Sequence, residues 1–207
     1  MSRLRTVGES GFTLVELVIA VVIMGVITLP LANFVLQYFD NYPKTLTVVS
    51  DSHDMQMAAA YFSADVANTG VRDTAATNVP QRSVWVSGSA LPAAYCGQDV
   101  GGSVVLLLSW DTATNSGAGP QQRDSVGYVA RSGTLIREFC PASGPSTRTT
   151  VVHSFVYPDP GNSSPVTCSS TCDAVTPPAT ISLRIGIKGD TDTTVSYVTL
   201  TGQRRQT

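Results

Sequence analysis

The chain has 207 residues and a formal net charge of −2 at pH 7, and 14% of its residues are charged. This length accommodates one membrane-anchoring segment and one domain of ordinary size. The near-neutral charge gives no indication of a polyanion, so no nucleic-acid partner is expected. The low charged fraction, with abundant Ser, Thr, Gly and Pro, favours a β-rich exported domain over a cytosolic helical one.

An apolar segment lies near the N-terminus, and within residues 12–39 the only charged side chain is Glu16. About twenty apolar residues in a helix span the roughly 30 Å hydrocarbon core of a bilayer. An ionised carboxylate at the centre of such a helix costs about 2.5–3.5 kcal/mol on insertion scales, and less near the interface. One interpretation is an ordinary anchor with an acidic residue near one end, and the other is a carboxylate kept for a specific contact.

A short polar stretch, residues 1–11, precedes the apolar segment and contains Arg3 and Arg5. An ordinary secretory signal places its apolar region before the cleavage site. Here the small residue Gly11 comes first, so cleavage after it would leave the anchor on the mature protein. The two arginines favour a cytoplasmic leader, with the remainder of the chain outside.

The sequence Gly11-Phe12-Thr13-Leu14-Val15-Glu16-Leu17 resembles the leader junction of type IV pilins and of type II secretion pseudopilins. The resemblance implies that a prepilin peptidase cuts after Gly11 and methylates the new amino terminus on Phe12. It also implies that Glu16 pairs with a terminal amine in the assembled fibre. The physics agrees, because a buried carboxylate is tolerated when a cation meets it.

The same resemblance implies the partners and the location of the protein. The partners are the prepilin peptidase, other pilin or pseudopilin subunits, an inner-membrane assembly platform and, before assembly, the lipid bilayer. The expected location is the cytoplasmic membrane, crossed once with the C-terminal head outside, and then a pilus or pseudopilus fibre at the cell surface.

Two features interrupt the apolar segment or follow it. Pro30, with Gly25 and Thr28 nearby, predicts either a kink that matters when subunits pack or a harmless membrane-helix proline. After the aromatic residues at the expected membrane surface, residues 40–43 (Asp-Asn-Tyr-Pro) predict a bend or a break.

Residues 44–68 contain no Gly or Pro and predict an amphipathic helix that ends near Gly70. The polar surface is assigned to Asp51, Asp54 and Asp65, and His53 is expected to be structural or solvated. The apolar stripe predicted to cover a sheet comprises Leu46, Val49, Met57, Ala60 and Ala64, broadened by Val48, Met55, Phe62 and Val66.

After Gly70 the apolar period changes to two, which indicates strands. Ser132-Gly133 predicts a tight hairpin turn, and residues 189–192 predict a second hairpin. The expected class is α+β, with a long N-terminal helix packed on an antiparallel β-meander, and this strand run resembles the heads of minor pilins and pseudopilins. The predicted strands are residues 83–87, 103–110, 125–130, 134–139, 149–157, 181–188 and 195–201.

Four cysteines lie downstream of the anchor: Cys96, Cys140, Cys168 and Cys172. An even number on the exported side favours disulfides, and four cysteines allow three pairings. The short spacing favours Cys168 with Cys172, which leaves Cys96 for Cys140. The alternative, a metal site, has a poor zinc signature in a single C-x3-C.

No catalytic or cofactor motif was found, so the chain is not expected to be an enzyme and no cofactor is assigned. Asp190 and Asp192 are either solvated turn residues, which is favoured, or incomplete ligands for calcium. Trp85, Trp110, Tyr95 and Tyr157 are expected to pack in the core.

The predicted organisation has four parts: a leader at 1–11, an apolar transmembrane and assembly helix at 12–42, an amphipathic helix at 43–70 and a β-rich exported head at 71–207. The predicted function is a minor pilin or pseudopilin. The alternatives are a membrane-anchored adhesin or ligand-binding tip subunit and, less favoured, an anchored enzyme.

Overall fold

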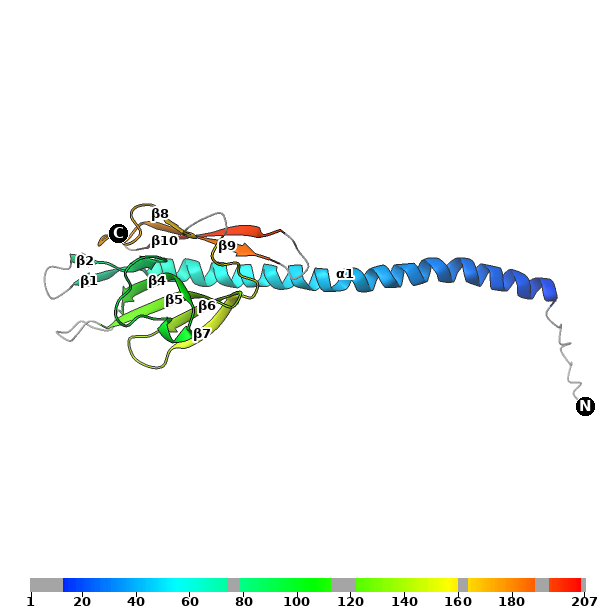
Figure 1. Ribbon diagram of the computed structural model, residues 1–207, viewed down its shortest axis with the longest axis horizontal. Coiled ribbons are helices and arrows are strands. Elements are labelled where there is room, and N and C mark those ends of the chain that lie inside the picture. Colours follow the sequence, from blue (N-terminus) through cyan, green and yellow to red (C-terminus); the bar gives the residue numbers. More distant parts are fainter. Residues whose placement is uncertain (1–12, 74–78, 113–121, 160–163, 189–193, 206–207) are drawn as a thin grey trace, which may run out of the picture. The chain divides into compact units, whose positions relative to one another are not determined.

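The computed structural model describes residues 13–73, 79–112, 122–159, 164–188 and 194–205. The chain divides into two compact units, Met1–Leu46 and Thr47–Thr207. One helix, α1 (Leu14–Asn68), contributes to both units, and antiparallel sheets follow it in the second unit (Figure 1). The predicted α+β class, a long N-terminal helix followed by antiparallel sheets, is confirmed.

In the first unit, α1 continues through both prolines of its sequence. At Pro30 the helix is uninterrupted, and two residues earlier the Thr28 hydroxyl donates a hydrogen bond to the carbonyl of Met24 at 2.8 Å. This bond lies in the turn before the proline, and the carbonyl of Val26 is the one that loses its backbone donor at Pro30.

The break predicted at residues 40–43 is wrong, because α1 has no interruption there. Asn41 Nδ2 donates to the carbonyl of Gln37 at 2.9 Å, and Thr45 Oγ1 donates to the carbonyl of Asn41 at 3.1 Å. Pro43 removes one backbone donor from a helix of 55 residues, and the helical hydrogen bonds of the flanking turns continue on both sides of it.

In the second unit, α1 buries a face that agrees only in part with the predicted stripe. Phe62 and Val66 of that stripe are buried as predicted, and Ala58, which was not part of it, is 1% exposed, whereas Val49 is 61% exposed. Ala60 and Ala64, which belong to the predicted stripe, are also exposed.

The assignment of Asp54 and Asp65 to the polar surface is also wrong, because both are buried, at 4% and 3% exposure. Apolar periodicity assigned these two residues to the surface because the buried face carries two carboxylates, which accept hydrogen bonds from Arg137 and from the backbone of His153.

The larger sheet has five strands in the order β3-β4-β5-β6-β7, which is a meander. The predicted hairpin at Ser132-Gly133 is confirmed: Arg131 pairs with Thr134, and both turn residues have positive φ, 48° and 76°. The strand predicted at 149–157 is shorter, and Phe155 beyond it makes an isolated bridge to Ile187. The strands are β3 (Val84–Val86), β4 (Ser103–Asp111), β5 (Arg123–Arg131), β6 (Thr134–Cys140) and β7 (Thr147–Val152).

The second sheet has the order β10-β9-β8 and packs on α1. A Cβ on Gly202 would lie 2.6 Å from the Cβ of Val66, so a glycine is required where β10 meets the helix. One core cluster joins this part of α1 to both sheets, and Figure 1 shows α1 running between them. The strands are β8 (Val166–Cys168), β9 (Thr180–Ile187) and β10 (Ser196–Gln203).

Several short elements were not predicted from the sequence. β1 (Val71–Asp73) and β2 (Val79–Gln81) form a two-stranded ribbon directly after the helix, and the 3-10 helix η1 (Gln98–Val100) precedes β4. Three-residue strands such as these and β8 are too short to show a period of two.

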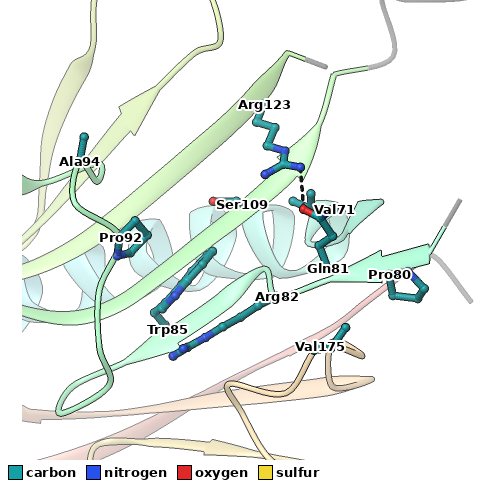
Figure 2. Close-up of a pocket in the computed structure, with 10 residues that line it drawn as sticks. All are labelled: Val71, Pro80, Gln81, Arg82, Trp85, Pro92, Ala94, Ser109, Arg123 and Val175. Carbon is teal, nitrogen blue, oxygen red and sulfur yellow. Dashed lines mark hydrogen bonds between the residues drawn. The ribbon is translucent and has the colours of Figure 1, made fainter. Parts of the chain in front are cut away.

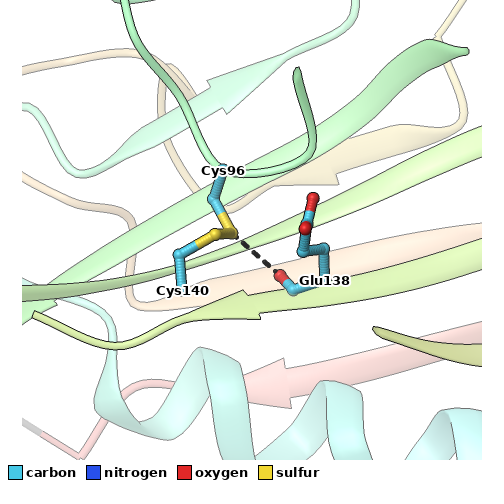
Figure 3. A group of neighbouring side chains, drawn as sticks. All are labelled: Cys96, Glu138 and Cys140. Atoms are coloured by element: carbon cyan, nitrogen blue, oxygen red, sulfur yellow. Dashed lines mark hydrogen bonds between the residues drawn. A yellow bond between two sulfur atoms is a disulfide. The ribbon is translucent and has the colours of Figure 1, made fainter. Parts of the chain in front are cut away.

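Two disulfides cross-link the head, Cys96–Cys140 and Cys168–Cys172, and these are the pairs that the spacing favoured. Buried Glu138 lies beside the first pair, and its backbone carbonyl is 3.1 Å from Cys96 Sγ (Figure 3). The three side chains are close enough to suggest a metal site. Both sulfurs are committed to the disulfide, however, so they offer no thiolate to a metal.

Candidate functional site

The first turn of α1 contains a reciprocal pair of hydrogen bonds between Thr13 and Glu16. The N–H of Thr13 donates to Glu16 Oε2 at 3.3 Å, and the N–H of Glu16 donates to Thr13 Oγ1 at 3.3 Å. This arrangement is a capping box, which satisfies two backbone donors that a helix N-terminus otherwise leaves unpaired. Glu16 therefore has a partner within its own chain, which the sequence interpretation missed although Thr-x-x-Glu is the signature of this cap.

Beyond this turn, the first half of α1 presents apolar side chains on its whole circumference. Leu17, Met24 and Leu29 are 59%, 69% and 70% exposed. The helix is long and apolar enough to cross a membrane, and none of the residues in its most apolar part is buried. A helix that is apolar all round requires lipid or other helices around it.

In the head, Asp65 joins α1 to the larger sheet. Arg137 of β6 donates from Nε and Nη2 to the two carboxylate oxygens at 2.8 and 2.6 Å, and the Tyr128 hydroxyl of β5 donates to Oδ2 at 2.6 Å. The two parallel bonds form the bidentate geometry that guanidinium and carboxylate groups prefer. Three side chains from three elements are thereby fixed in the core.

The surroundings of this cluster raise the pKa values of Tyr128 and Arg137. Burial raises the pKa of Tyr128 well above its ordinary value of 10.0, and the adjacent Asp65 carboxylate raises it further. Burial opposes the charge of Arg137, but the hydrogen bonds and the charge of Asp65 outweigh it and raise the pKa of Arg137. The cluster is therefore an ion pair with a neutral phenol at neutral pH.

A second buried carboxylate, Asp54, holds the residue that follows β7. Its Oδ2 accepts from the backbone N–H of His153 at 2.9 Å and lies 2.8 Å from the His153 ring Nδ1. The other histidine, His53, is exposed. The structure thus gives His153 a positioning contact that the sequence could not indicate, because the two partners are far apart along the chain.

Several predicted site residues lie outside the described part of the chain. These are Gly11 and Phe12, the two sides of the expected cleavage site, and Asp190 and Asp192, the candidate calcium ligands. Of the expected processing and assembly residues, the structure describes Glu16.

Residues 8–32 match the family model described as the prokaryotic N-terminal methylation motif. The chain therefore carries the signature of type IV pilins and pseudopilins, a class of proteins that prepilin peptidase processes and that is generally structural. The motif and the apolar helix together fit anchoring in a membrane before assembly. Comparison with curated proteins and with solved structures found no match.

Proposed function

We propose that this chain is a structural subunit of the pilin type, a minor pilin or pseudopilin that assembles into a type IV pilus or a type II secretion pseudopilus. The observation that carries the proposal is the methylation motif at residues 8–32, which opens a helix with fully exposed apolar sides and Glu16 in its first turn.

In this proposal, residues 1–11 are a leader that prepilin peptidase removes after Gly11, and Phe12 becomes the methylated amino terminus. Residues 12–42 anchor the subunit in the cytoplasmic membrane with the head outside. Residues 43–70 continue as the helix of the head, and residues 71–207 form its β-rich part. An inner-membrane platform then moves the apolar segment from lipid into a fibre of like helices.

The minor-pilin or pseudopilin assignment rests on the head. The head is rich in loops and carries two disulfides. Loops commonly carry specific functions, so this head suits a subunit with a specialised position more than an abundant shaft subunit. The disulfides also agree with a head that lies in an oxidising compartment.

Intact-mass measurement of the protein isolated from its native host tests the processing step. The expected mass is that of residues 12–207 plus one methyl group. A Gly11→Ala variant serves as a control that leaves the apolar helix unchanged, and its leader should be retained in large part. Recovery of the wild-type protein with residues 1–11 still attached would overturn the proposal.

A further inference from the structure

A cavity of about 580 Å³ opens on the head beside the β1–β2 ribbon (Figure 2). Ligand sites in proteins commonly have volumes of about 300–1,000 Å³. Its apolar lining includes Trp85 of β3, Pro92 and Val175, which come from separate parts of the chain. Two arginines, Arg82 and Arg123, also line it, so the cavity combines an aromatic surface with positive charge.

Both arginines are held in place while part of each side chain remains exposed. Arg82 lies 5.3 Å from the centre of the Trp85 ring and pairs with Asp173 at 3.3 Å. Arg123 donates to Gln81 Oε1 at 2.8 Å. The side chains of Arg82 and Arg123 are 29% and 43% exposed. A guanidinium has five N–H donors, so the contacts that position these two groups leave donors for a ligand.

A smaller cavity of about 110 Å³ adjoins the first, and the two share Val71 and Pro80 in their linings. Arg72 and Arg204 line it. The buried Nε of Arg204 has no hydrogen-bond partner among the described residues. Burial, and then the nearby charge of Arg72, lower the pKa of Arg204. A buried donor without an acceptor is unfavourable, and an anion in this cavity would supply one to Arg204.

We propose that these adjoining cavities bind a carbohydrate whose sugar rings carry carboxylates. Trp85 and Pro92 offer apolar surface to the C–H faces of a sugar, while Gln81 and Ser109 offer neutral hydrogen-bonding groups to its hydroxyls. The arginines, distributed over two cavities, suit carboxylates on separate sugar rings.

The charge of the site argues against a polyphosphate. Asp173 pairs with Arg82, and Asp111 lies 3.7 Å from Arg123, so a carboxylate lies beside each of these arginines. They would repel a polyphosphate, which has no neutral groups to place beside them, whereas an acidic sugar chain can turn its hydroxyls toward them and its carboxylates toward the arginines.

Calorimetric titration of the full-length chain in detergent micelles tests this proposal. The probe is α-1,4-linked hexagalacturonate, and maltohexaose is the neutral control of equal length. Wild type should bind the first and not the second. Arg204→Gln and Arg123→Gln should each weaken binding about tenfold, because each removes charge-assisted hydrogen bonds to a carboxylate.

The matched control is Arg131→Gln, which removes a charge from the opposite end of the same strand as Arg123. Its affinity should stay within about twofold of wild type, as expected for a distant exposed charge. Arg204→Lys, which keeps the charge and loses the planar fork, should fall between wild type and Arg204→Gln. The thermal midpoint of each variant shows that the head remains folded.

Four results would overturn the proposal: no binding of hexagalacturonate by wild type, equal binding of maltohexaose, equal weakening by Arg131→Gln, or tighter binding of hexaglutamate or hexaphosphate than of hexagalacturonate. The last result would identify an acidic peptide or a polyphosphate as the better ligand. None of them bears on leader processing, which the mass measurement decides.

Discussion

Glu16 has one set of contacts in the single chain and a different one in the proposed fibre. In the single chain its carboxylate caps the first turn of α1 through Thr13. In the proposed fibre it would instead meet a terminal amine, a stronger partner because that hydrogen bond is charge-assisted on both sides. The capping box therefore gives the Glu16 carboxylate hydrogen bonds from neutral groups of its own chain. Without them the carboxylate would lie unpaired in an apolar environment.

Replacing Glu16 separates anchoring from assembly. Glu16→Ala should insert into the membrane as wild type does, because it removes a charge from an apolar helix. It should fail to form fibres, because the terminal amine loses its partner. Membrane fractionation and electron microscopy of immunogold-labelled fibres measure the two outcomes in the native host.

Thr13→Ala is the matched control, since it breaks the cap and keeps the carboxylate. Loss of an N-cap costs about 1 kcal/mol locally, so fibres of this variant should still form. Normal fibre formation by Glu16→Ala would show that the proposed pairing is not needed.

Tyr128 makes the stability of the head sensitive to alkaline pH. The unfolded chain loses the phenolic proton near pH 10, whereas burial and Asp65 raise the pKa of Tyr128 in the folded protein. Below pH 10 the stabilisation is fully present. As pH rises above 10, the unfolded state binds fewer protons than the folded state, and the free energy of unfolding falls.

A comparison of wild type with Tyr128→Phe isolates this effect. At neutral pH the variant should be about 1 kcal/mol less stable, because it lacks the hydrogen bond to Asp65. That difference should shrink between pH 9 and pH 11, as measured by chemical denaturation in a series of buffers. A difference that stays constant across this range would contradict the assigned cause.

At the scale of elements, the two disulfides constrain loops of very different length. Cys96 and Cys140 are separated by 44 positions in the sequence, and Cys168 and Cys172 by 4. The first joins the segment before η1 to the end of β6, whereas the second closes a small loop just after β8. In the chain-entropy view, the longer loop restricts the unfolded chain more.

Replacement of each pair by serine should therefore have unequal effects. Loss of Cys96–Cys140 should lower the free energy of unfolding by about 4 kcal/mol and loss of Cys168–Cys172 by about 2 kcal/mol. Denaturant titration of the two double variants gives both values, with the fully oxidised wild type as reference. Equal losses would indicate that native contacts near the bridges, and not loop length, determine their effect.

At the scale of the whole molecule, local patterns predicted most of the architecture. The methylation motif is contiguous, the strand of residues 103–110 is a short apolar run, and the strand of residues 181–188 alternates clearly, so all three are visible without tertiary information. The Ser132-Gly133 turn was predictable for the same reason, because Ser-Gly marks tight turns and its glycine adopts positive φ readily.

The errors arose where partners from distant segments decide the outcome. From the sequence alone, Asp54 and Asp65 are predicted to be solvated. The structure places Arg137 and Tyr128 beside Asp65, and His153 beside Asp54. The cavity around Trp85 depends on segments from β1 to the loop after β8, and no single stretch of sequence marks it. Periodicity describes one element at a time, so it misses contacts that several elements make together.

The close packing of Gly202 on Val66 joins β10 to a helix that precedes it far along the chain, and this sets an order for folding. Because synthesis runs from the N-terminus, the helix is made well before the β10 surface that covers it. Until then, Val66 and its neighbours have no cover from that side. The core on this side of the helix can therefore close only after β10 has been made, and a variant truncated before residue 202 should leave Val66 uncovered and the head more sensitive to proteolysis.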